Sequence, residues 1–82
     1  MFLQNRHPSV WSGIEFFLAR NGFGLDETTL STGMLFSPRH PCELARARQL
    51  VTELSARVPE ADVYIRFFGE QLNIGVRCKG TP

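Results

Sequence analysis

Residues 63–78 of this 82-residue chain read VYIRFFGEQLNIGVRC, and this stretch decides the fold class. Apolar residues alternate with other residues on both sides of Gly69-Glu70, at Val63, Ile65 and Phe67 and then at Leu72, Ile74, Val76 and Cys78. A period of two is typical of a strand with one buried face. Gly69 suits the first central position of a type II′ turn, and a two-residue loop then pairs Phe67 with Leu72. The stretch therefore predicts a β-hairpin with every one of these apolar residues on the same face.

Residues 41–58, which precede the hairpin, carry the clearest helical pattern. Their apolar residues recur every three or four positions and form one stripe, at Leu44, Ala47, Leu50, Val51, Leu54 and Val58. This spacing predicts an amphipathic helix. Pro41 suits the first position of that helix, and Pro59 ends it. Arg46 and Arg57 are expected on its outer, solvated side.

Two weaker elements are expected in the first half of the chain. Residues 8–21 have apolar side chains at helical spacing, and Asn21-Gly22 can close that helix. Residues 28–36 alternate and predict a strand, in which Gly33 indicates a bulge or a close backbone approach. Two prolines within residues 37–41 then force a turn. Residues 1–5 are compatible with a further short strand.

Together these elements predict a single small α+β domain spanning residues 1–82. We expect two helices packed on one face of a small three- or four-stranded sheet that ends in a C-terminal β-hairpin. The order of the elements is βαβαββ if residues 1–5 form a strand, and αβαββ if they do not. The sequence shows no internal repeat, linker or low-complexity segment.

The composition is that of a folded protein without a strong overall charge. Hydrophobic residues make up 43% of the chain, which is more than a disordered chain carries. The formal net charge is only +1, so the surface as a whole should not attract nucleic acid or anionic membranes. No apolar run approaches the roughly 20 residues that cross a bilayer, and no signal-peptide pattern is present. A cytoplasmic protein without membrane contact is expected.

Four potential zinc ligands occur in the sequence, at His7, His40, Cys42 and Cys78. Structural zinc sites usually present their ligands in pairs that lie a few residues apart. Only His40 and Cys42 approach that spacing, and Pro41 lies between them. We therefore expect no metal site and no cofactor.

Cys42 is the best candidate for a reactive group. It is expected in the first turn of the helix at residues 41–58, where the helix dipole and the nearby Arg39 and His40 favour a thiolate. A nucleophilic enzyme also needs an oriented base, and no sequence pattern supplies one. Glycine-rich motifs for phosphates or dinucleotides are missing from the sequence as well. No catalytic residue is expected, and the chain is predicted not to be an enzyme.

The second face of the predicted hairpin combines aromatic and basic residues. It should display Tyr64, Arg66, Phe68, Asn73, Gly75, Arg77 and Lys79. On an open sheet, such residues bind a protein partner, or they stack bases and neutralise phosphates. The alternative is that another element covers this face. The outer side of the helix at residues 41–58, with Arg46 and Arg57, is the competing binding surface.

These observations favour a non-enzymatic protein-binding module, an inhibitor or adaptor. The chain lacks catalytic motifs, and its seven Phe, one Trp and one Tyr are more large aromatics than a small core obviously needs. One setting that fits is a small phage or mobile-element protein that inhibits a bacterial defence complex, such as an anti-CRISPR protein. The alternative is a small nucleic-acid-binding domain that uses the basic and aromatic hairpin face. Both a monomer and a homodimer are compatible with the sequence.

Overall fold

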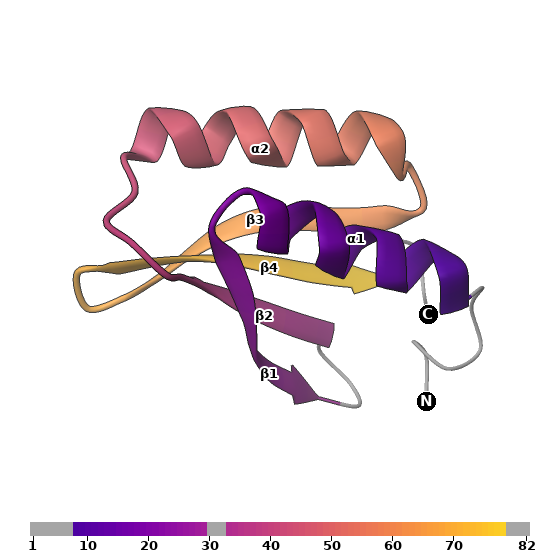
Figure 1. Cartoon of the computed structure of the whole chain (residues 1–82), viewed down its shortest axis with the longest axis horizontal. Coiled ribbons are helices and arrows are strands. Elements are labelled where there is room, and N and C mark those ends of the chain that lie inside the picture. The colour runs from indigo at the N-terminus through magenta and orange to yellow at the C-terminus, as the bar shows by residue number, and fades with distance from the viewer. Residues whose placement is uncertain (1–7, 30–32, 79–82) are drawn as a thin grey trace.

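The computed structural model describes residues 8–29 and 33–78, and it shows two helices on one antiparallel sheet. In chain order the elements are α1 (Pro8–Arg20), β1 (Phe23–Thr29), β2 (Gly33–Pro38), α2 (Leu44–Arg57), β3 (Ala61–Phe68) and β4 (Gln71–Cys78). The strands lie in the order β1-β2-β4-β3, and both helices cover the same face of the sheet (Figure 1). The predicted α+β class is confirmed. The strand considered at residues 1–5 lies outside the described residues.

The hairpin formed by β3 and β4 has the register that the sequence predicts. Phe67 pairs with Leu72, Ile65 with Ile74 and Val63 with Val76. Gly69 has a φ of 61°, while no described residue other than glycine has a positive φ, so Glu70 follows with a negative one. This combination fits a type II′ turn. The two-residue loop therefore fixes which side chains of both strands face the helices.

Residues 23–38 form a second hairpin, so the prediction of one strand at residues 28–36 is wrong. β1 and β2 pair antiparallel, with a register shift between Leu25 and Glu27. Gly33, at the start of β2, has a φ of 101°, and a Cβ there would overlap the carbonyl oxygen of Val76. This glycine permits both the backbone conformation and a close approach to β4. The alternation of Met34 and Phe36 belongs to β2 alone, and the predicted strand extended it across a chain reversal.

Helix α2 begins three residues later than predicted. Its first residue is Leu44, and the N-cap Glu43 has an extended backbone with φ −75° and ψ 149°. Pro41 and Cys42 therefore precede the helix, and Cys42 does not lie in its first turn. The physical reason is that residues 39–43 carry the chain from the sheet to the helix layer, through a bend at residues 39–40 and an extended Glu43. The predicted end is confirmed, since the Val58 N–H donates to the Leu54 carbonyl oxygen at 2.9 Å.

The hydrophobic core lies between the helices and the sheet. Each helix supplies three buried residues with the same spacing: Trp11, Ile14 and Leu18 from α1, and Ala47, Leu50 and Leu54 from α2. The sheet supplies its helix-facing residues, among them Phe23, Met34, Phe36, Val63, Ile74 and Val76. These alternate along the strands with residues of the other sheet face, as a two-layer structure requires.

The chain repeats one topological unit, a helix followed by two antiparallel strands. α1, β1 and β2 form the first unit, and α2, β3 and β4 form the second. The second strands of the two units meet in the middle of the sheet, where Leu35 lies opposite Gly75. The two helices run in opposite directions over the sheet (Figure 1). The molecule therefore has an approximate twofold axis through the Leu35 and Gly75 pair, although the sequence shows no repeat.

Candidate functional site

One side of the sheet faces away from both helices, and we call it the outer face (Figure 1). Val63, Ile74 and Val76 are buried beneath the helices, so the residues that alternate with them point to the outer face. On β3 and β4 these are Asp62, Tyr64, Arg66, Phe68, Asn73, Gly75 and Arg77. Neither helix covers these residues. The helices leave this hairpin face uncovered, although Asn73 and Gly75 are buried within it.

Tyr64 lies midway along the edge strand β3 on the outer face, and its ring leans across β4. Its cross-strand neighbour is Gly75, and a Cβ at that position would overlap the Tyr64 ring. The guanidinium of Arg77 lies 5.3 Å from the centroid of the same ring, and Arg77 Nε donates to Asp62 Oδ2 at 2.9 Å. These contacts hold the half-buried Tyr64 in one orientation. A pre-positioned aromatic ring loses little conformational entropy when a partner covers it.

Arg66 and Phe68 form the exposed end of the outer face. The Arg66 guanidinium lies 5.1 Å from the Phe68 ring centroid, and 48% of Phe68 is exposed. Within residues 8–29 and 33–78, Arg66 has no ion pair. Its charge is therefore available to a carboxylate or a carbonyl oxygen of a partner. Beside it, Asn73 is fully buried, and its Oδ1 accepts a hydrogen bond from Gln71 Nε2 at 3.0 Å.

The first hairpin extends the outer face with residues that the sequence did not identify. Leu35 is half-buried beside Gly75, and Ser37 follows it on the same side of β2. The Arg39 guanidinium lies where a Cβ of Gly24 would be. Leu35 was missed because the sequence does not show which strand the segment at residues 28–36 pairs with. Ser37 Oγ is buried without a hydrogen-bond partner among the described residues.

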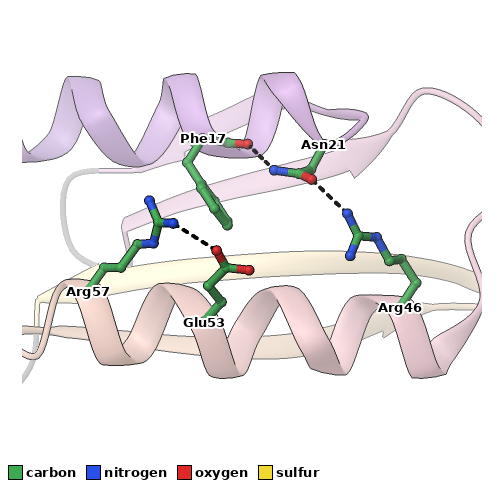
Figure 2. A network of polar contacts seen from close by, with 5 residues as sticks. All are labelled: Phe17, Asn21, Arg46, Glu53 and Arg57. Carbon is green, nitrogen blue, oxygen red and sulfur yellow. Dashed lines mark hydrogen bonds and ion pairs between the residues drawn. The ribbon is translucent and has the colours of Figure 1, made fainter.

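Arg46 and Arg57 lie in the helix layer, on the opposite side of the sheet from the outer face (Figure 2). Arg46 Nη2 donates to Asn21 Oδ1 at 2.7 Å, and Asn21 Nδ2 donates to the Phe17 carbonyl oxygen at 2.8 Å. Arg57 forms a 2.9 Å ion pair with Glu53 and lies 5.1 Å from the Phe17 ring centroid. Both arginines therefore bridge α2 and α1. They do not join Tyr64 and Arg66 in one surface, and Lys79 lies outside the described residues.

Of the groups considered for catalysis and metal binding, Cys42 and His40 have described side chains, whereas His7 lies outside the described residues. Cys42 is a half-buried free thiol whose Sγ contacts the Glu43 carbonyl oxygen at 3.5 Å, and His40 is exposed. Among the described residues, no group of three or more His, Cys, Asp or Glu side chains could hold a metal ion. In the same part of the chain, no helix is long and apolar enough to cross a membrane.

No family model, no curated protein and no solved structure matches the chain. Among the described residues, the outer face combines a sheet surface that neither helix covers with Tyr64, which packs on Gly75, and Arg66, which has no ion pair.

Proposed function

We propose that the chain is a non-enzymatic protein-binding module, acting as an inhibitor or adaptor in the cytoplasm, and that it binds its partner through the outer face. The observation that carries the proposal is the combination of Tyr64, Arg66 and Phe68 on a sheet surface that neither helix covers. Tyrosine and arginine are the residue types that most often dominate binding energy at protein interfaces.

The charge distribution favours a protein over a nucleic acid as the partner. Arg77 already donates to Asp62, so the outer face carries fewer free positive charges than its composition suggests. The formal net charge of +1 adds little attraction for phosphates. Nucleic-acid binding usually requires several basic residues that each contact a phosphate and release counterions. Arg66 and Arg39 alone supply few such contacts.

The proposal is tested by capture with matched variants of the tagged chain. The wild type, Tyr64→Ala and Phe68→Ala are each used to isolate partners from a lysate of the source organism, with and without nuclease. A purified partner is then titrated calorimetrically. Truncation of either outer-face ring should weaken binding by about 1 kcal/mol or more. Phe16→Ala is the control, because Phe16 is 64% exposed on α1 and lies beneath Arg20 much as Phe68 lies beneath Arg66.

Two outcomes would contradict the proposal. Binding that is lost after nuclease treatment and declines steeply with salt would identify a nucleic acid as the partner. Binding that Tyr64→Ala and Phe68→Ala leave intact, but Phe16→Ala weakens, would place the binding surface on the helix layer.

A further inference from the structure

The strand β3 forms one edge of the sheet and is open to pairing. It spans Ala61–Phe68, pairs with β4 through all eight residues without a register shift, and contains neither proline nor glycine. Within the part of the chain that the structure describes, no strand lies on its other side. The opposite edge differs, because β1 has a bulge between Leu25 and Glu27 and carries acidic residues there. Bulges and charges protect an edge against pairing, and β3 has no bulge.

The sequence of β3 is complementary to itself when two copies run antiparallel. With Tyr64 opposite Tyr64 of a second copy, Asp62 lies opposite Arg66 on the outer face, twice by symmetry. On the helix-facing side, Val63 then lies opposite Ile65, and Ala61 lies opposite Phe67. Opposite charges and apolar pairs in direct cross-strand positions stabilise a sheet. We propose that the chain forms a homodimer through this β3 to β3 pairing, which joins two sheets into one.

Other symmetric registers have less of this complementarity within β3. Centring the pair on Ile65 would place Asp62 opposite Phe68 and Tyr64 opposite Arg66. Centring it on Val63 would place Asp62 opposite Tyr64. The register centred on Tyr64 gives Arg66 a carboxylate from within β3, Asp62, whereas the register centred on Val63 places Arg66 opposite Glu60, which precedes the strand. Asp62 would then accept hydrogen bonds from Arg77 of its own copy and Arg66 of the second copy.

The side of α2 next to the β3 edge also carries apolar residues suited to contact with a second copy. Arg46 and Arg57 face α1, and Leu50 and Leu54 face the sheet. By helical geometry the flank that faces away from α1 carries Leu44, Arg48, Val51 and Ser55. Leu44 is 40% exposed, and it lies seven residues before Val51, which lies seven before Val58. In two helices packed side by side, each apolar contact position recurs every seven residues, and Leu44, Val51 and Val58 supply one such position.

The twofold axis that relates the two β3 strands also relates the apolar residues Leu44, Val51 and Val58 of the two copies. From Ala61 to Tyr64 the strand advances about 10 Å, which is the length of about seven helical residues. Because the chain reverses between α2 and β3, seven residues counted back from Val58 reach Val51, which by this estimate lies level with Tyr64 along the strand, in the helix layer. A twofold axis through Tyr64 therefore brings Val51 near Val51 of the second copy, and Leu44 near Val58. The exposed Phe67, at 53%, covers the region of Ala61 in the second copy.

The first test measures association of the full chain by analytical ultracentrifugation over a range of concentrations. Arg66→Glu and Asp62→Lys each create two like-charge pairs in the dimer, so each should raise the dimer Kd about tenfold or more. An equimolar mixture of the two variants should restore wild-type association, because both cross-strand pairs of the mixed dimer are again opposite in charge. Arg20→Glu makes the same charge change on α1 and should leave association unchanged.

The second test fixes the register. In a background with Cys42→Ser and Cys78→Ser, Tyr64→Cys should form an intermolecular disulfide under mild oxidation, because directly opposite Cα atoms lie about 4.5–5.5 Å apart. Arg66→Cys should not, because its nearest copy lies four strand positions away, about 13 Å. A wild-type chain that stays monomeric at millimolar concentration overturns the proposal. Equal crosslinking by both cysteine variants, or a charge-swapped mixture that fails to associate, overturns the pairing.

Discussion

Gly75 leaves the space that the Tyr64 ring occupies above β4, because a Cβ at this position would overlap the ring. We expect Gly75→Ala to displace the ring and destabilise the wild type. In a Tyr64→Ala background the same change should be neutral or stabilising, since alanine loses less backbone entropy on folding than glycine. A double-mutant cycle by urea denaturation should give a coupling free energy of about 1 kcal/mol. Additive effects of the two substitutions would contradict this account of the contact.

Gly33 and Gly13 should respond in opposite directions to the same substitution. Gly33 has a φ of 101° and no room for a Cβ against the β4 backbone, so Gly33→Ala should cost about 2 kcal/mol or more. Gly13 lies on the exposed side of α1, where an added Cβ would meet open space, so Gly13→Ala should stabilise by about 0.5–1 kcal/mol. Thermal denaturation of both variants measures the difference. A similar loss in both would show that Gly33 is not a special backbone position.

The sequence predicts which hairpin side chains face the core, but not how the outer side chains lie. The face that each hairpin side chain occupies depends only on the alternation along the strands and on the length of the loop. Both are visible in the sequence, at Val63, Ile74 and Gly69. That Tyr64 leans onto Gly75, and that Arg77 selects Asp62, depends on rotamers and on neighbouring strands. Such choices come from packing, which a pattern along one strand does not contain.

The two hairpins differ in how far the sequence specifies them. β3 and β4 alternate without interruption around one turn glycine, so their existence and register are predictable. β1 and β2 are not, because β1 carries a bulge after Leu25 and includes Gly24 and Asp26, which are uncommon in strands. Gly33 marks the start of β2 and not a bulge within a strand, and the close backbone approach that it also indicated is present. The start of α2 was misplaced for a related reason, since a proline suits both a first helical residue and an extended connection.

The two helix and hairpin units should not fold separately. They meet in the middle of the sheet, where Met34, Leu35 and Phe36 pair with Val76, Gly75 and Ile74. Each unit has about half of the chain, near the lower limit of about 40 residues for folding without disulfides or metals. Fragments 1–40 and 41–82 should each show little helix by circular dichroism, and an equimolar mixture should regain it. A single fragment with dispersed NMR signals would contradict this expectation.

The candidate site was only partly predictable for the molecule as a whole. The alternation along β3 and β4 predicts which aromatic and basic residues share the outer face. Whether the helices cover that face depends on how the two units pack, which the sequence pattern does not show. Arg46 and Arg57 look like surface charges in the sequence, yet they contact Asn21 and Phe17 across the helix layer. Those contacts join residues far apart in the chain, and neither a helical pattern nor a charge count identifies them.

The placement of the single tryptophan and the single tyrosine gives the natural chain two intrinsic optical reporters. Trp11 is 6% exposed in the core beneath α1, whereas Tyr64 lies on the outer face. Tryptophan emission therefore follows the integrity of the core, and tyrosine absorbance follows events on the open side of the sheet. Surface association and unfolding can thus be distinguished spectroscopically in the unlabelled, unmodified protein.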